Sequence, residues 1–349
     1  MDPVKIQKQL DQHRKTVSFD SYDITVRQIF DMVEEKSIEI APDYQRHFIW
    51  NSERQSTLIE SLLLGIPIPS LFMATNQDST WEVIDGLQRL TTLVNFIGKD
   101  DLIKKVNPKG TRLRLTELEK LSEMNGLLYS ELPKSIQLHL QTRPIRVTVL
   151  NDKTDRDIRF ELFERLNTGG VILHAQEIRN CVYVGKFNEL IKELAEYDNF
   201  RSVVKSTENS VLTGNFEELV LKFFAYYDDR EIFVHSVKEF LNSYMEKKTK
   251  RFEDEKKMRT LFQNTFDLLA RILPNGIVRG TRVNVTPLVL FEAIAIGVAD
   301  LLTEGKEVNA ARLNEILNDP ELKRLTTGAT NTKNRLIDRI AFVKEKALA

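Results

Sequence analysis

The segment Asp85-Gly86-Leu87-Gln88-Arg89 carries the most informative arrangement of polar residues in the chain. It follows a short apolar run and precedes residues with helical spacing, which predicts a strand, a glycine turn and the start of a helix. Such a junction presents unpaired backbone N–H groups and the positive end of the helix dipole, both of which attract anions. Gly86 lets a phosphate approach the backbone, and the planar guanidinium of Arg89 can grip its oxygens. The segment therefore predicts a phosphate-binding turn.

Each polar side chain of this turn has a candidate role in chemistry. Asp85 is expected to bind a divalent metal or a ribose hydroxyl, or to orient Arg89. Gln88 is expected to position an attacking water. The alternative is that Asp85 caps the helix and Arg89 pairs with a surface carboxylate. The spacing alone leaves both interpretations open, because short glycine motifs often occur without function.

A second segment, residues 42–50, combines aromatic side chains with a histidine, an arginine and an amide. Arg46 is a candidate ligand for a second phosphate, and Tyr44 is expected to stack on a base or to cap a pocket, with Gln45 between them. The apolar residues after His47 are better explained as core anchors, and His47 itself as a hydrogen-bonded structural histidine.

A third segment joins a predicted helix to the sequence Asn167-Thr168-Gly169-Gly170, and a further helix is expected over residues 175–184. The glycine pair is first of all a helix C-cap. Polar side chains, Asn167, Thr168 and Arg179 among them, gather around this hairpin of helices. Their composition predicts one wall of a polar pocket.

Taken in this order, the three segments resemble the N-terminal domain family of GmrSD-type modification-dependent restriction systems, over about residues 20 to 185. The matching motifs are Pro42-Asp-Tyr-Gln-Arg46 with Phe-Ile-Trp50, Ile84-Asp-Gly-x-Gln-Arg89-Leu-Thr-Thr-Leu93, and Phe163-x-Arg-Leu-Asn-Thr-Gly-Gly170 with Gln176-Glu-Ile-Arg179. The chain departs from the family at Leu87, where relatives usually carry a second glutamine. A leucine cannot hydrogen-bond a nucleotide or a water.

The resemblance implies a ParB/sulfiredoxin-like α/β core that binds a nucleoside triphosphate at the Asp-Gly-x-Gln-Arg turn. In that family, nucleotide hydrolysis is linked to phage defence and to recognition of modified DNA. The residues that match its two nucleotide motifs are Asp85, Gly86, Gln88 and Arg89, and Tyr44, Gln45 and Arg46. Many relatives carry an HNH nuclease domain. Residues 186–349 hold a single histidine, His235, so any DNA cleavage is expected to need a partner protein.

Composition and charge indicate a globular protein without an overall bias toward nucleic acid. The 50 lysine and arginine residues balance the 51 aspartate and glutamate residues, so any basic surface must be local. Cys181 is the only cysteine, which excludes internal disulfides and favours a reducing compartment. We find no secretory signal pattern, and the most apolar stretch, residues 287–302, is too short to span a bilayer. We expect a cytoplasmic protein that does not enter membranes and can form oligomers.

The apolar patterns predict an α+β chain. A small ParB-like mixed α/β nucleotide-binding domain is expected over residues 1–185 and a mainly α-helical domain over residues 186–349. We expect strands at 71–74, 81–84 and 144–150. Helices are expected at 24–35, after Asn51 as far as Gly65, and at 89–97, 175–184, 237–245, 258–273, 287–302, 310–317 and 334–346, with caps at Asn215 and Glu218 for one more. The stretch 288–298 is apolar nearly all round, which predicts the central helix of a bundle.

Two functions follow from these residues. The first is a subunit that binds and hydrolyses nucleoside triphosphate with Mg²⁺, as the sensor of a bacterial anti-phage or modification-dependent restriction system. Asp85 would hold the metal, and Arg46 or Arg89 would neutralise the developing charge. The alternative is a non-catalytic DNA-binding or regulatory module in which the same arginines hold DNA phosphates. A ParB-like switch that binds nucleotide but barely hydrolyses it lies between the two.

Overall fold

The computed structural model divides the chain into two compact units, Met1–Ile172 and Leu173–Ala349. The residues that it describes are 2–13, 18–40, 48, 50–76, 78–107, 110–151, 160–162, 164–165, 174–206, 214–280, 284–328 and 330–348. The division falls before the boundary expected at residue 185. The segment 174–185 therefore belongs to the second unit, and each unit is described by itself.

Unit 1 is built on a five-stranded mixed sheet with strand order β1-β5-β3-β4-β2. The strands are β1 Phe19–Thr25, β2 Ile38–Glu39, β3 Leu71–Thr75, β4 Trp81–Asp85 and β5 Pro144–Leu150. β1 pairs with β5 and β3 with β4 in antiparallel fashion, whereas β3–β5 and β2–β4 are parallel. The three strands predicted from sequence are confirmed as β3, β4 and β5.

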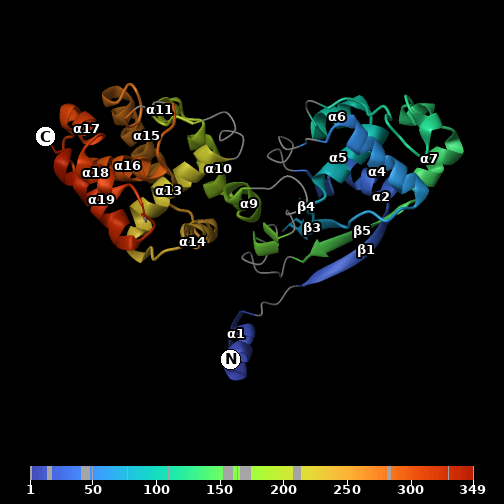
Figure 1. Cartoon of the computed structure of the whole chain (residues 1–349), viewed down its shortest axis with the longest axis horizontal. Coiled ribbons are helices and arrows are strands. Elements are labelled where there is room, and N and C mark those ends of the chain that lie inside the picture. The colour runs from blue at the N-terminus through green and yellow to red at the C-terminus, as the bar shows by residue number, and fades with distance from the viewer. Residues whose placement is uncertain are drawn as a thin grey trace. The chain divides into compact units, whose positions relative to one another are not determined.

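The helices of unit 1 pack together beside this sheet (Figure 1). They are α2 Val26–Glu34, α4 Ser52–Leu64, α5 Leu87–Ile97, α6 Asp100–Val106, α7 Lys134–Gln141 and the short 3₁₀ turns η1 Ser122–Met124 and η2 Tyr129–Glu131. A further helix, α1 Pro3–His13, precedes β1 in the chain. The helix predicted from Ile24 was placed too early, because residues 19–25 pair with β5 along their whole length. Thr25 ends the strand and caps α2 by accepting a hydrogen bond from the Gln28 N–H.

Helix α4 forms as its flanking residues predict. Asn51 accepts a hydrogen bond from the Arg54 N–H at the N-terminus. Gly65 closes the C-terminus in the left-handed conformation at φ 73°, which glycine adopts without strain. The buried face of α4 packs into the same core as β3 and α5, which fixes the helix that follows the Gly86 turn.

Unit 2 is mainly helical. Its helices are α9 Ala175–Val182, α10 Lys186–Ala195, α11 Asp198–Val203, α13 Asn215–Asp229, η4 Arg230–Ile232, α14 Val237–Lys250, α15 Glu255–Ile272, α16 Leu288–Thr303, α17 Ala310–Ile316, α18 Pro320–Leu325 and α19 Lys333–Lys346. Residues 290–301 of α16 are all buried, which confirms it as the central helix. Asn215 does not cap α13 as predicted. Gly214 is the N-cap residue, at φ 71°, and the Glu218 side chain instead pairs with Arg179 and Lys222.

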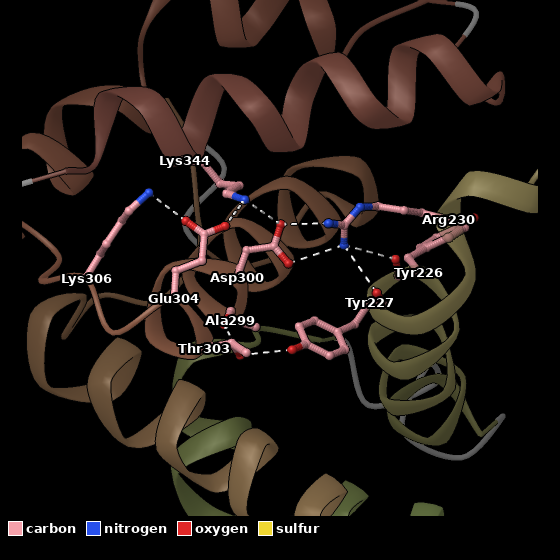
Figure 2. A network of polar contacts seen from close by, with 9 residues as sticks. All are labelled: Tyr226, Tyr227, Arg230, Ala299, Asp300, Thr303, Glu304, Lys306 and Lys344. Carbon is pink, nitrogen blue, oxygen red and sulfur yellow. Dashed lines mark hydrogen bonds and ion pairs between the residues drawn. The ribbon is translucent and has the colours of Figure 1, made fainter.

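Charged side chains hold α16 to its neighbours inside unit 2. Glu292, 5% exposed, forms an ion pair with Arg339 of α19 at 2.5 Å, and its other oxygen lies 3.9 Å from Lys222 Nζ of α13. Near the end of the helix, Asp300 pairs with Arg230 at 2.9 Å and with Lys344 at 3.3 Å (Figure 2). These carboxylates on α16 therefore bind cations from the segments that surround it.

We expect Glu292→Ala to destabilise unit 2 by about 3–5 kcal/mol, because it leaves the buried Arg339 guanidinium without a carboxylate partner. The matched control is Glu321→Ala, which breaks an ion pair with Arg324 between two exposed side chains and should change stability little. Urea unfolding followed by far-ultraviolet circular dichroism measures both. Equal shifts of the two midpoints would contradict a structural role for the buried pair.

Candidate functional site

The turn between β4 and α5 depends on Gly86. Its φ of 105° lies in the left-handed region, which residues with a side chain rarely adopt. A Cβ atom at this position would lie 2.3 Å from Leu71 Cδ2, on a side chain that is fully packed at the start of β3. Backbone conformation and packing therefore both require glycine here. The helix begins at Leu87, two residues before its predicted start, and receives no side-chain cap.

Arg89 and Asp85 form an ion pair across this turn. Arg89 Nη2 donates to Asp85 Oδ2 at 2.6 Å, and Nη1 donates to the Pro69 carbonyl oxygen at 2.6 Å. The Arg89 side chain is only 10% exposed, so the turn does not leave its guanidinium open to solvent. Asp85 does not cap the helix. It orients Arg89, one of the roles foreseen for it, while its side chain stays 30% exposed and its Oδ1 has no partner in the described part of the chain.

Gln88 connects this turn to the end of the second sequence motif. Its Oε1 accepts a hydrogen bond from the Trp50 backbone N–H at 3.2 Å. The Trp50 carbonyl in turn accepts from Gln55 Nε2 at 3.0 Å, and Gln55 Oε1 accepts from Asn95 Nδ2 of α5 at 3.0 Å. Trp50 packs against the core, as expected of an anchor. The Gln88 side chain therefore positions the chain that follows residues 42–47.

Several predicted site residues lie outside the described residues. They are Tyr44, Gln45 and Arg46 of the second motif and Asn167 and Thr168 of the third. His47, Phe163 and the glycine pair after Thr168 lie outside them as well. The nucleotide-binding roles assigned to these residues stay predictions.

Arg179 lies on α9 in unit 2 and forms an ion pair with Glu218 in the first turn of α13. Its side chain is buried and donates to Glu218 Oε2 at 3.2 Å, Asn242 Oδ1 at 2.8 Å and Gln176 Oε1 at 3.1 Å. Glu218 and Asn242 lie 39 and 63 residues further along the chain. Local sequence patterns therefore could not identify them as partners of Arg179. For Arg179 to hold a phosphate, these hydrogen bonds would have to break.

The electrostatics around Arg179 fit a buried ion pair. Burial lowers the pKa of the Arg179 guanidinium, and the charge of Glu218 opposes this. Burial raises the pKa of Glu218, but the charges of Lys222 and Arg179 outweigh it and hold the pKa below its usual value. The pair therefore stays charged, and it links α9 to α13.

Within the part of the chain that the structure describes, neither a cluster of metal ligands nor a membrane-spanning helix is present. No group of three or more histidine, cysteine, aspartate and glutamate side chains there is arranged to hold a metal ion. Among the same residues, no helix has both the length and the apolar character that crossing a membrane requires.

Comparison with known families finds one similarity, and it covers the part of the chain that holds the strand–glycine–helix turn. Residues 26–184 match the family model of the GmrSD restriction endonuclease N-terminal domain, which confirms the resemblance carried by the sequence motifs. The match covers less than half of the chain. Curated proteins offered no match.

One solved structure, a Pnob8-like ParB-N domain, is similar at 12% identity, with 96% of this chain and 100% of that chain covered. Its TM-score of 0.24 is too low to carry an argument about fold. The order predicted from sequence, a small mixed α/β part followed by a mainly helical part, is confirmed by the structure itself.

We expect Gly86→Ala to destabilise unit 1 by roughly 1–3 kcal/mol, because alanine is strained at this φ and its Cβ meets Leu71. Gly126→Ala is the matched control, since Gly126 also has a positive φ but an added Cβ meets nothing within 4 Å. Urea unfolding followed by fluorescence of Trp50 and Trp81, the two tryptophans of the chain, measures both. A smaller loss in Gly86→Ala than in the control would contradict the packing argument.

We expect Gln88→Ala to speed deuterium exchange at the Trp50 amide several-fold, because it removes the acceptor of that N–H. Gln141→Ala is the control in the same unit, where a glutamine side chain instead donates to the Tyr129 hydroxyl. Exchange measured by mass spectrometry on peptides covering residue 50 reports the difference. Unchanged exchange in Gln88→Ala would show that Gln88 does not position this segment.

Proposed function

We propose that this chain is the subunit of a bacterial anti-phage or modification-dependent restriction system that binds and hydrolyses nucleoside triphosphate and acts as its sensor. The observation that carries the proposal is the Asp85–Arg89 pair at a glycine turn that opens a helix, inside a domain that matches the GmrSD family. Helix N-termini entered through a glycine favour anions, since the N–H groups and the dipole point toward the ligand.

Arg89 supports phosphate binding because its positive charge is fixed close to Gly86, although the side chain is mostly buried. Its Nη2 atom would lie 3.4 Å from a Cβ at Gly86, so a positive charge lies directly behind the turn. The pair with Asp85 and the bond to Pro69 hold the guanidinium rigidly. A fixed charge of this kind stabilises negative charge on a phosphoryl group without reorganising during the reaction.

Asp85 fits a Mg²⁺ ion bound mainly through the nucleotide. Its Oδ2 is engaged by Arg89, whereas Oδ1 has no partner in the described residues and the side chain is 30% exposed. Mg²⁺ is usually held by one or two carboxylates together with phosphates and water, so a single free carboxylate oxygen is sufficient. When bound, the ion would neutralise phosphate charge. Gln88, which holds the Trp50 backbone, would also position the attacking water.

DNA is the proposed substrate of the complete system. The family that residues 26–184 match is described as a restriction endonuclease N-terminal domain. We propose that cutting requires a nuclease partner. His235, the only histidine after residue 186, is exposed and its Nδ1 lies 3.0 Å from the Asn331 carbonyl oxygen, with no group of metal ligands among the described residues.

We expect Asp85→Asn to remove the gain in triphosphate affinity that Mg²⁺ provides, by about tenfold or more, while binding without metal persists. Asparagine keeps an oxygen for Arg89 but lacks the negative charge. Asp23→Asn is the control, because Asp23 also pairs with an arginine in unit 1, Arg146, away from the turn. Titration calorimetry with a non-hydrolysable ATP or GTP analogue, with and without Mg²⁺, measures the effect. An undiminished Mg²⁺ gain in Asp85→Asn would refute the metal role.

We also expect the purified chain alone not to cut DNA, because hydrolysis of the HNH kind needs a histidine base beside a bound metal. The assay incubates phage-derived and unmodified DNA with triphosphate and Mg²⁺ or Mn²⁺. Specific cleavage that disappears in His235→Ala would overturn this expectation and reveal a nuclease centre in unit 2.

A further inference from the structure

Unit 2 contains a groove of about 610 Å³ that the proposed nucleotide function does not use. It is lined by the first turns of α15, the end of α13 and the end of α16. Its size falls in the range of roughly 300–1,000 Å³ in which small molecules bind. The lining of the groove is part apolar and part polar, and this combination defines a class of ligand.

Part of the groove lining is apolar and consists of Tyr227 of α13, Leu302 of α16 and Leu261 of α15. The Tyr227 ring stacks on Phe223 with an interplanar angle of 12°. Thr303 Oγ1 donates to the Ala299 carbonyl at 2.9 Å, so the Tyr227 hydroxyl must donate to Thr303 Oγ1, also at 2.9 Å (Figure 2). The hydroxyl proton is thus engaged, and the ring is held as a fixed surface for a flat apolar group.

The remaining lining includes polar side chains on α15. Lys256, Lys257, Thr260 and Asn264 line the groove at helical spacing and are exposed. Within the described part of the chain, none of the four side chains forms a hydrogen bond or an ion pair. This contrasts with Arg259 on the same helix, which is paired with both Glu193 and Glu255.

The carboxylates at the groove are already engaged. Glu253 pairs with Arg251 at 3.0 Å, and Asp254 pairs with Lys248 at 2.8 Å. The ammonium groups of Lys256 and Lys257 are therefore the charges that a ligand can still bind. Because they line the same groove as Tyr227, Leu261 and Leu302, the complementary molecule has an anionic group and a flat apolar body.

We propose that this groove binds a small organic anion, with its planar apolar body against Tyr227 and Leu302 and its phosphate or carboxylate at Lys256 and Lys257. The site is separate from the Gly86 turn and does not depend on the nucleotide function proposed for it. It gives unit 2 a ligand of its own, in addition to its packing role.

The test uses 1-naphthyl phosphate as the probe and titration calorimetry on the full chain. We expect saturable binding that weakens at least about tenfold in the double variant Lys256→Glu/Lys257→Glu. Lys186→Glu is the matched control, because Lys186 is an exposed lysine in the first turn of α10 that forms no ion pair with any described residue, and the variant should bind like the parent. The uncharged 1-naphthol should bind more weakly and should not respond to the double variant.

Four results would overturn the proposal. They are the absence of saturable binding, equal affinity in the parent and the double variant, an equal loss in Lys186→Glu, and a loss confined to Arg89→Ala, which would place the probe in unit 1. Circular dichroism of each variant establishes that it is folded. If the double variant is not, Lys256→Ala/Lys257→Ala replaces it, with at least about a fivefold loss expected.

Discussion

The Arg89 guanidinium needs hydrogen-bond acceptors in a place that water scarcely reaches. A buried cation is tolerated only when it is paired and hydrogen-bonded, and Arg89 meets this condition with the Asp85 carboxylate and the Pro69 carbonyl. These two acceptors come from the end of β4 and from the segment that leads into β3. One side chain of α5 therefore fixes two parts of the sheet against the start of the helix. The residue at the turn is glycine, because any Cβ there would enter the space of Leu71.

The same turn also contacts Trp50, the last residue of the second motif. Gln88 is in the first turn of α5 and binds the backbone of Trp50, and Gln55 and Asn95 support that residue from α4 and α5. Gln88, which the sequence predicts to act on a ligand, therefore also holds the backbone of a neighbouring segment in place. We regard the polar groups around Gly86 as rigidly placed before any ligand arrives, which favours binding of a charged phosphate.

Sequence patterns predicted the elements whose own residues determine them. β3, β4 and β5 are apolar runs, α4 is set by its caps, and α16 is apolar nearly all round. β1 was missed because five of its seven residues are exposed, so it lacks the alternation that marks a half-buried strand. The burial of Arg89 and the partners of Arg179 could not be predicted either, since both depend on residues brought together only by tertiary packing.

The central claim is that triphosphate binds at the Gly86 turn, and a crystal structure of the chain with a non-hydrolysable ATP or GTP analogue and Mg²⁺ tests it most directly. We expect phosphate oxygens at the N-terminus of α5, within hydrogen-bond distance of its first backbone N–H groups, and the metal within coordination distance of Asp85 Oδ1. An analogue bound away from this turn, with no ligand beside the Asp85–Arg89 pair, would contradict triphosphate binding at Gly86.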